Sequence, residues 1–328
     1  MRIRGPVALL ATVLAAGSCA PAAQPSNDRV LVTNEALNQI AEIDGATGSI
    51  EGHLVTGGRP RGMALSPDRR TLYVAASNAQ RIEVWDLASG RRVRVMGPLP
   101  NPEQFAISPD GRQFYLPSED AGAVLFVNAA SGKIVRQVRT GPEAEGAAVS
   151  PDGRLLVVTS ELANIAQFVD TVTGKVLDTI PVGQRPRFIH FAGSGKSVWV
   201  SSELRGTISV LDTATHRVVQ TIDLAQSFDI EEPVQAEAIA ETTDGRRLFV
   251  AMGRSNRVAE IDPSTFAVVR SFATGERTWN IALSPDGKRL YAVSGLSGTV
   301  TIVDLIRNKV ARTISLGGRP WGAVVVPK

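Results

Sequence analysis

The sequence contains little of what most enzyme active sites use, with one cysteine, three histidines and 5% aromatic residues in 328 positions. One cysteine excludes an internal disulfide, and no Cys-x-x-Cys-His segment is present to attach haem. No histidine pair has metal-ligand spacing, and no Gly-x-Ser-x-Gly segment supplies a serine nucleophile. We therefore expect no enzyme activity, no resident cofactor and no metal site.

An excess of positive charge is also absent once the N-terminus is set aside. The whole chain has a formal net charge of +3, from 35 basic and 32 acidic residues. Without Arg2 and Arg4, 33 basic residues face 32 acidic ones. This balance gives no general attraction to nucleic acid, so we expect none as a partner.

Long apolar runs are absent except at residues 7–16, which follow Arg2 and Arg4 and precede Cys19. This order is typical of a secretory signal peptide. The position of Cys19 predicts a lipoprotein-type signal over residues 1–19 with an acylated cysteine, followed by a flexible tether over residues 20–28. Ordinary cleavage near residues 20–22, with Cys19 discarded, is the alternative. Either way we expect export to the periplasm or outer envelope, with membrane contact only through the lipid.

The rest of the chain is a repeat built on one turn. Ser150-Pro151-Asp152-Gly153 has the proline, aspartate and glycine that a tight turn needs, and short apolar runs flank it. The aspartate recurs every 42 residues, except in one unit, where Ser194 stands in its place. The distance from Ser194 to the next aspartate, Asp244, is 8 residues longer than the others. The equivalent aspartates are Asp68, Asp110, Asp152, Asp244 and Asp286.

A second series with the same period shows that each unit contains two tight turns and four short strands. Its members are Asp44, Asp86, Asn128, Asp170, Asp212, Asp262 and Asp304. Four antiparallel strands repeated seven times predict an all-β fold, a seven-bladed β-propeller that forms one domain over residues 29–328. We expect the strand near the C-terminus to join the N-terminal blade and close the ring, and the protein to be a monomer.

Propeller geometry gathers one set of side chains at one end of the central channel. The innermost strands begin there, and the loops after the second strands reach the same end. The candidate ligand-binding residues are Arg59, Arg61, Arg185, Arg187, Arg277, Trp279, Arg319, Trp321, Glu161 and Glu203. They favour an anionic or aromatic ligand, because arginine binds carboxylates and stacks on flat rings. The alternative is an ion-pair network between blades, with the tryptophans filling the axis.

Glutamates recur in the loops after the second strands, as Glu35, Glu119, Glu161 and Glu203. Such oxygen ligands suit a hard cation. Pairing with the arginines is the interpretation that we favour.

The units resemble the YVTN repeat at residues 72–75 and 208–215. More narrowly, residues 159–161, 184–188, 199–203 and 319–322 resemble the PQQ-dependent catabolism-associated β-propeller proteins. That resemblance implies an exported, non-catalytic binding or accessory protein of PQQ-dependent alcohol oxidation or its transport system, with PQQ as a ligand. Gly193-Ser194-Gly195 and Ala236-Glu237 depart from the family pattern. The alternatives are a propeller enzyme, such as a lactonase or quinoprotein subunit, and a propeller that binds single-stranded nucleic acid or a surface polymer.

Overall fold

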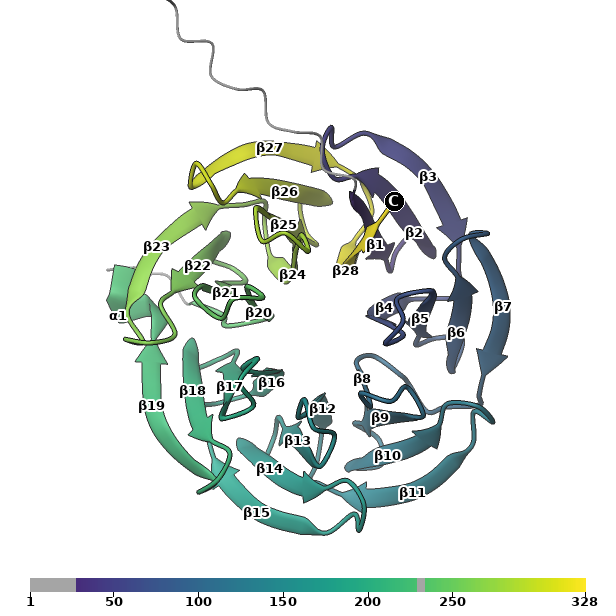
Figure 1. Ribbon diagram of the computed structural model, residues 1–328, viewed down its shortest axis with the longest axis vertical. Coiled ribbons are helices and arrows are strands. Elements are labelled where there is room, and N and C mark those ends of the chain that lie inside the picture. The colour runs from purple at the N-terminus through teal and green to yellow at the C-terminus, as the bar shows by residue number, and fades with distance from the viewer. Residues whose placement is uncertain (1–27, 229–233) are drawn as a thin grey trace, which may run out of the picture.

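A computed structural model describes residues 28–228 and 234–328. Seven four-stranded antiparallel sheets stand around a central axis, so the predicted seven-bladed β-propeller is confirmed (Figure 1). The predicted signal peptide, Cys19, the tether before Asp28 and part of the insertion lie outside the described residues.

The blades follow the chain in order, and the first strand of each lines the channel. Blade 1 contains β28 (Pro320–Pro327), β1 (Asp28–Asn34), β2 (Gln39–Asp44) and β3 (Ile50–Val55). Blade 2 contains β4 (Pro60–Leu65), β5 (Thr71–Ala76), β6 (Arg81–Asp86) and β7 (Arg91–Met96). Blade 3 contains β8 (Ala106–Ile107), β9 (Gln113–Ser118), β10 (Ala123–Asn128) and β11 (Ile134–Arg139).

The remaining blades repeat the same order of strands. Blade 4 contains β12 (Ala144–Val149), β13 (Leu155–Ser160), β14 (Ile165–Asp170) and β15 (Val176–Pro181). Blade 5 contains β16 (Pro186–Phe191), β17 (Ser197–Ser202), β18 (Thr207–Asp212) and β19 (Arg217–Asp223). Blade 6 contains β20 (Ile239–Glu241), β21 (Leu248–Ala251), β22 (Arg257–Ile261) and β23 (Val268–Ala273), and blade 7 contains β24 (Thr278–Leu283), β25 (Arg289–Ser294), β26 (Thr299–Asp304) and β27 (Lys309–Ser315).

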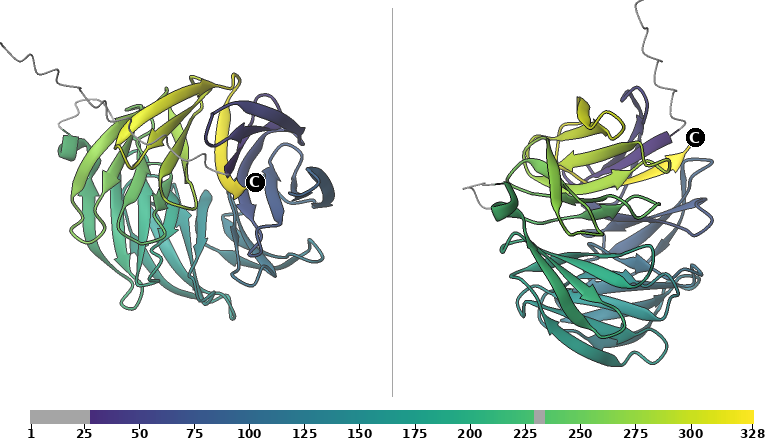
Figure 2. Two further views of the ribbon diagram at one scale, coloured as in Figure 1. Left: turned by 45° about the horizontal axis from the view of Figure 1, so that its top comes forward. Right: turned by 60° about the vertical axis from the view of Figure 1, so that its left-hand side comes forward.

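The C-terminal strand closes the ring, as predicted. β28 pairs with β1 in antiparallel register from Asp28 opposite Pro327 to Asn34 opposite Pro320. Figure 2 shows these two strands side by side in both views. Arg69 of blade 2 also donates from its guanidinium to the Val325 carbonyl at 2.8 Å. The ring is therefore tied at its closure by backbone pairing and by the neighbouring blade.

The repeated turn fixes the end of the channel where the first strands finish. The Ser150 hydroxyl donates to Asp152 at 2.5 Å, and the Arg154 amide donates to the same carboxylate oxygen at 3.1 Å. Gly153 then takes a left-handed φ of 75°, which glycine adopts without a steric cost. The same serine–aspartate bond recurs in blades 2, 3 and 7, so the sequence interpretation of this turn is confirmed.

The hydrophobic core lies between the faces of adjacent blades. Tyr73 and Met96 of blade 2, for example, pack in one cluster with Phe114 and Leu125 of blade 3. Such clusters occupy one blade interface after another around the ring. Each blade therefore buries both faces against its neighbours.

One short helix, α1 (Leu224–Phe228), interrupts the all-β pattern, and the sequence did not predict it. The Asp223 carboxylate accepts the amides of Ala225 and Gln226, each at 3.1 Å, and so caps its first turn. A helix of five residues leaves no apolar periodicity in the sequence, which explains the omission. In residues 28–228 and 234–328, no helix has the length and apolarity to cross a membrane.

Candidate functional site

The first strands of all blades begin at one end of the channel, which we call the mouth. Seven equivalent residues stand there, one at the start of each blade, and three residue types share the seven positions. In blade order they are Trp321, Arg61, Glu103, Glu145, Arg187, Glu237 and Trp279. Gly62 donates its amide to the Glu103 carbonyl at 2.8 Å, and a Cβ at Gly62 would lie 2.5 Å from that oxygen. Glycine next to Arg61 therefore allows the two blades to approach closely at the mouth.

Asparagines fix the arginines that precede this ring. The amide of Arg185 donates to Asn164 Oδ1 at 3.0 Å, and Arg277 makes the same bond to Asn256 at 2.9 Å. Both arginines have left-handed φ values, 56° and 58°, which non-glycine residues adopt only when held. The asparagine of one blade thus sets the position of a guanidinium on the next.

At blade 2, two arginines are neutralised by two glutamates. Arg61 Nε donates to Glu35 at 2.9 Å, and Arg59 donates to Glu103 Oε1 at 2.6 Å. Arg61 also binds the second Glu103 oxygen. Glu103 is buried, so both of its oxygens are satisfied by guanidinium groups.

Blade 5 contains the centre of a second network. Arg187 is buried and contacts the carboxylates of Glu145 at 2.7 Å, Glu161 at 3.1 Å and Glu203 at 3.1 Å. Glu203 is also within 3.0 Å of the Arg277 guanidinium, and Arg185 Nε lies 2.7 Å from Glu161. The arginines and glutamates are therefore held by one another across blades 4, 5 and 7.

Both mouth tryptophans have arginines over their rings. The Arg277 guanidinium carbon lies 4.1 Å from the Trp279 ring centroid, and that of Arg187 lies 5.6 Å away. Trp321 is buried, with Arg61 at 5.4 Å from its ring. These cation–π contacts occupy indole faces of the two candidate ligand-binding tryptophans.

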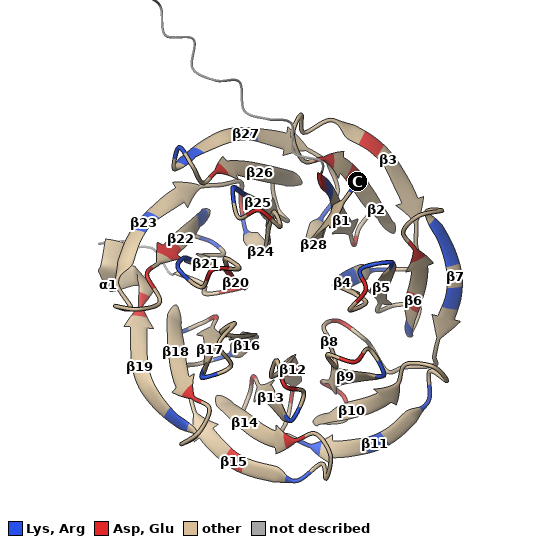
Figure 3. Ribbon diagram, in the orientation of Figure 1, with Lys and Arg blue, Asp and Glu red and all other residues tan. Residues whose placement is uncertain are grey.

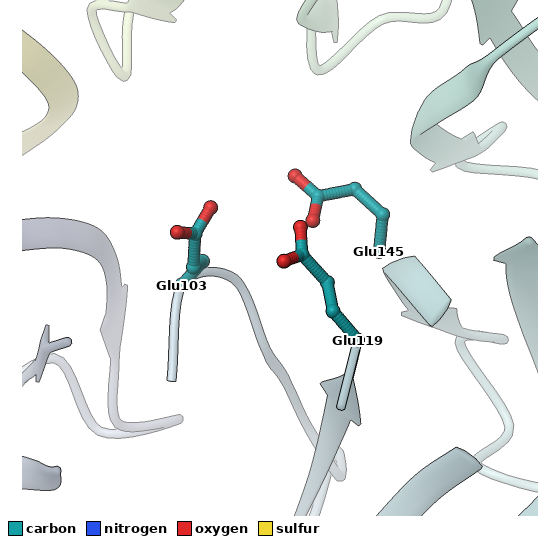
Figure 4. Close-up of side chains that lie close together, drawn as sticks. All are labelled: Glu103, Glu119 and Glu145. Atoms are coloured by element: carbon teal, nitrogen blue, oxygen red, sulfur yellow. The ribbon is translucent and has the colours of Figure 1, made fainter. Parts of the chain in front are cut away.

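Two of the four glutamates in the loops after the second strands form an ion pair with the ring residue of the next blade, and two do not. The glutamate after the second strand of a blade faces the ring residue 26 positions later, as Glu35 faces Arg61 and Glu161 faces Arg187. At the same spacing, Glu119 of blade 3 meets another glutamate, Glu145 of blade 4. Figure 4 shows the two carboxyl groups pointing toward each other beside Glu103. The site thus has like-charged neighbours at two blade interfaces, because Glu203 of blade 5 is likewise followed by Glu237 as the ring residue of blade 6, and the charge of Glu203 helps to raise the pKa of Glu237. Of these two pairs, Glu119 and Glu145 are the one whose carboxyl groups lie in one cluster with Glu103.

The two carboxyl groups differ in their affinity for a proton. Burial, reinforced by the charges of Glu145 and Glu103, raises the pKa of Glu119 to about 7. Burial alone would raise the pKa of Glu145, but the Arg187 guanidinium outweighs it and holds that pKa below its usual range. Of the two carboxyl groups, Glu119 therefore holds a proton more readily, and in its protonated form it can donate a hydrogen bond to the Glu145 carboxylate.

Three glutamates at the mouth are close enough together to be candidate ligands of a cation. One oxygen each of Glu103, Glu119 and Glu145 lies within 4.8 Å of the others. A cation would compete there with Arg59 and Arg61, which already bind both Glu103 oxygens. Three of the four glutamates named in the cation hypothesis, Glu35, Glu161 and Glu203, contact arginine, as the favoured interpretation expected.

Glu237 is the most isolated charged group of the ring. It is fully buried, and among the described residues neither carboxylate oxygen has a hydrogen-bond partner. Burial raises its pKa well above the usual value, although the Arg187 guanidinium opposes this. A neutral acid in this position fits the crowded, arginine-rich centre of the network.

The structure brings nine of the ten candidate residues into these contacts. Arg319 is exposed and forms no ion pair with any residue in the described part of the chain. Sequence reasoning missed the Glu119–Glu145 pair and the role of the asparagines. The constant spacing of 26 residues is the signal that would have found the pair. Figure 3 shows basic and acidic residues together in the loops around the ring.

The chain resembles known propeller proteins in sequence and in fold. The family model described as lactonase, 7-bladed beta-propeller, matches residues 148–313. The chain belongs to this family. The match is to lactonase propellers in general, and the narrower resemblance to PQQ-associated propellers stays a prediction. No curated protein matches the chain.

Solved structures share the fold of this lactonase propeller. Periplasmic gluconolactonase PpgL of Pseudomonas aeruginosa is 23% identical, with a TM-score of 0.76 over 91% of this chain and 99% of that one. A protein of unknown function from Desulfotomaculum acetoxidans is 17% identical, with a TM-score of 0.75 over 89% and 98%. Hydrazine synthase of Kuenenia stuttgartiensis is 18% identical, with a TM-score of 0.70 over 80% and 88%. At these identities the likeness shows the fold alone.

A cavity of about 430 Å³ opens beside the second network, between blades 4 and 5. Glu161 and Arg185 line it together with Leu162 and Leu204. Cavities of about 510 and 770 Å³ lie between blades 3 and 4 and between blades 1 and 2, and residues of the tight turns line them. Those two lie at the end of the channel opposite the mouth.

Proposed function

We propose that this lactonase propeller hydrolyses an uncharged lactone at the mouth, with Glu119 and Glu145 as its acid–base pair. The observation that carries the proposal is the like-charge contact of these two residues, at a position where blades 2 and 5 place an arginine. Opposed carboxyl groups beside glutamates that are mostly paired with arginine are costly for stability alone. Perturbed acids of this kind gather where proton transfer takes place.

The pair supplies both proton transfers that lactone hydrolysis requires. The Glu145 carboxylate accepts a proton from the attacking water, whose oxygen bonds to the lactone carbonyl carbon. Glu119 then donates its proton to the ring oxygen as the carbon–oxygen bond of the ring breaks. The product is a hydroxy acid, and the pair again shares one proton. Arg187, 2.7 Å from Glu145, keeps that carboxylate ionised before the reaction.

The charge at the mouth favours an uncharged substrate. Glutamates and arginines gather there, and five of the arginines already contact glutamate. The glutamates include Glu35, Glu103, Glu119, Glu143, Glu145, Glu161, Glu203 and Glu237, and the arginines include Arg59, Arg61, Arg185, Arg187, Arg277 and Arg319. A multiply charged anion would have to displace these contacts, whereas the carboxylate product is repelled and leaves.

A second candidate function is the one expected from the resemblance, a non-catalytic binder of PQQ or of a periplasmic partner in PQQ-linked oxidation. Arg319 favours it, because its exposed guanidinium is free of ion pairs with described residues. Export supports both candidates. The periplasmic location printed for PpgL agrees with the predicted signal peptide, and we propose the same compartment here. Acylation of Cys19 stays a prediction.

The rate of lactone opening as a function of pH tests the proposal. Glucono-1,5-lactone and δ-valerolactone are incubated with purified protein, and the rate is compared with that of buffer alone. We expect the rate to fall above about pH 7, where Glu119 loses its proton, and again in acid, where Glu145 gains one. Glu119→Gln removes proton transfer and should lower kcat by about 100-fold or more.

The same preparation separates the two candidates. PQQ is titrated against wild type and Arg319→Gln by calorimetry. Lactone turnover without PQQ binding supports the hydrolase. PQQ binding that Arg319→Gln abolishes, with no lactone turnover, supports the accessory role and contradicts our proposal.

A further inference from the structure

We propose that the cavity between blades 4 and 5 holds an aliphatic substituent of the lactone, so that the preferred substrates are alkyl-substituted lactones. This inference rests on the proposed function and adds the part of the substrate that does not react. The first observation behind it is that two leucines of the cavity wall are exposed to solvent.

Leu162 and Leu204 occupy the same loop position in neighbouring blades, and both line the cavity. Their exposed fractions are 63% and 60%, high for large apolar side chains beside a cavity. The equivalent residues of blades 1, 2, 3 and 6 are alanine or polar: Ala36, Asn78, Asp120 and Arg254. Blade 7 has Leu296, but both of its neighbouring blades lack leucine at this position. Only blades 4 and 5 therefore form a two-sided apolar wall.

The cavity is connected to the acid–base pair by one arginine. Glu161 lines the cavity and lies 3.1 Å from Arg187, whose other nitrogen lies 2.7 Å from Glu145. Glu143, also in the cavity wall, precedes Glu145 by two residues. Buried Arg187 stands between the cavity and Glu145, so we place the alkyl chain of a lactone held at Glu119 past this arginine, toward the leucines.

The walls are held in place before any ligand arrives. The Glu161 amide donates to the Glu143 carbonyl at 2.9 Å, and the Leu204 amide donates to the Gln184 carbonyl at 3.2 Å. These bonds join the loop of each blade to the start of the same blade. A preformed wall loses little conformational freedom on binding, so an apolar group gains most of its transfer free energy.

Charge in the cavity disfavours an anionic group on the substituent, because the carboxylates of Glu143 and Glu161 both line it. Arg185 Nε is bound to Glu161 Oε2 at 2.7 Å, so the cation of the cavity already has its counter-ion. The volume of about 430 Å³ lies within the range of small-molecule sites. An uncharged chain of several carbons fits both conditions.

The test compares δ-lactones with alkyl chains of increasing length, from δ-valerolactone to δ-octalactone and δ-decalactone. We expect kcat/KM to rise about threefold for each methylene until the cavity is full. Leu204→Ala should lower kcat/KM for δ-octalactone about tenfold, with a loss that grows with chain length. Leu296→Ala removes an equally exposed leucine from the same loop position of blade 7 and should change nothing.

Binding is read separately from turnover, so that the two proposals fail in different ways. In saturation-transfer NMR with the slow Glu119→Gln variant, δ-octalactone should show its strongest signals on the alkyl chain, and adding Leu204→Ala should remove them. Hydrolysis that does not depend on chain length, or chain signals unaffected by Leu204→Ala, would overturn the aliphatic subsite and leave the hydrolase standing. Chain signals in a wild-type protein that hydrolyses no lactone would overturn only the hydrolase.

Discussion

The two ends of the propeller are made from loops that recur in every blade, but the ring positions at the mouth vary, whereas the turns at the opposite end keep the same serine–aspartate bond in four blades. Opposite the mouth, the Ser108, Ser150 and Ser284 hydroxyls each donate to an aspartate two residues later at 2.5–2.6 Å. At the mouth, seven equivalent positions carry arginine, glutamate or tryptophan. The backbone needs the same turn in each blade, so repetition identifies the scaffold. Variation among equivalent positions identifies the residues that a ligand or reaction requires.

The mouth also contains unfavourably placed carboxyl groups, whereas the carboxylates of the turns at the opposite end are hydrogen-bonded. Glu119 faces Glu145 without an arginine between them, and Glu237 is buried with both oxygens unpaired among the described residues. At the opposite end, hydrogen bonds from Ser150 and the Arg154 amide lower the pKa of Asp152, so its ionised form is satisfied. The difference between strained and satisfied carboxylates is the basis of the predictions below.

The largest effect on stability should come from removing β28, the strand that runs from the mouth to the opposite end. Deleting residues 319–328 removes Trp321 from the mouth and Val325 and Val326 from the core, all of them buried. Each contributes about 1.5–3 kcal/mol when fully buried, and the deletion also leaves β1 without its partner. We expect loss of cooperative thermal unfolding by calorimetry. Deletion of Lys328 alone is the control, and a truncated protein that melts within a few degrees of wild type would show that β28 is not needed for closure.

The mouth network should be the next most sensitive region. Glu203→Ala removes one of the three buried carboxylates around Arg187 and the carboxylate bound to Arg277, and should lower the free energy of unfolding by about 3–5 kcal/mol in urea denaturation. Glu276→Ala, an exposed glutamate at the start of blade 7, is the matched control and should stay within about 0.5 kcal/mol. Equal, small losses for both variants would mean that the network adds nothing to stability.

The fold could be predicted from the sequence because the turns recur at a constant spacing, and Asp152 with its flanking strands defines a whole unit. The gathering of arginine and glutamate at the mouth followed from the same repeat. The pairing of Glu119 with Glu145 across a blade interface was missed, although the constant spacing of 26 residues contained its signal. The cavity beside Leu162 and the helix α1 also depend on packing between blades, for which sequence periodicity contains no signal.

A single turn at the opposite end should have the smallest effect. Asp152→Asn weakens the bonds from Ser150 and the Arg154 amide, and we expect a loss on the order of 0.5–1 kcal/mol at pH 7 for this exposed group. The pKa of Asp152 is lowered in the folded state, so its contribution is present above the unfolded value of about 3.9 and is lost as pH falls through the folded value. Urea denaturation of both proteins at pH 7 and pH 3 should show the difference shrinking in acid. A difference that is constant with pH would mean that the charge of Asp152 has no part in the turn.

The most direct test of the difference between the two ends uses two variants of blade 3. Glu119→Gln alters the mouth, and Asp110→Asn alters the turn at the other end of the same blade. Lactone hydrolysis is measured from pH 5 to 9, together with the thermal midpoint of each protein. The account predicts that Glu119→Gln loses hydrolysis and its inflection near pH 7 while keeping its thermal midpoint, and that Asp110→Asn keeps the wild-type pH profile with a slightly lower midpoint. Full activity in Glu119→Gln, or equal loss of activity in both variants, would contradict it.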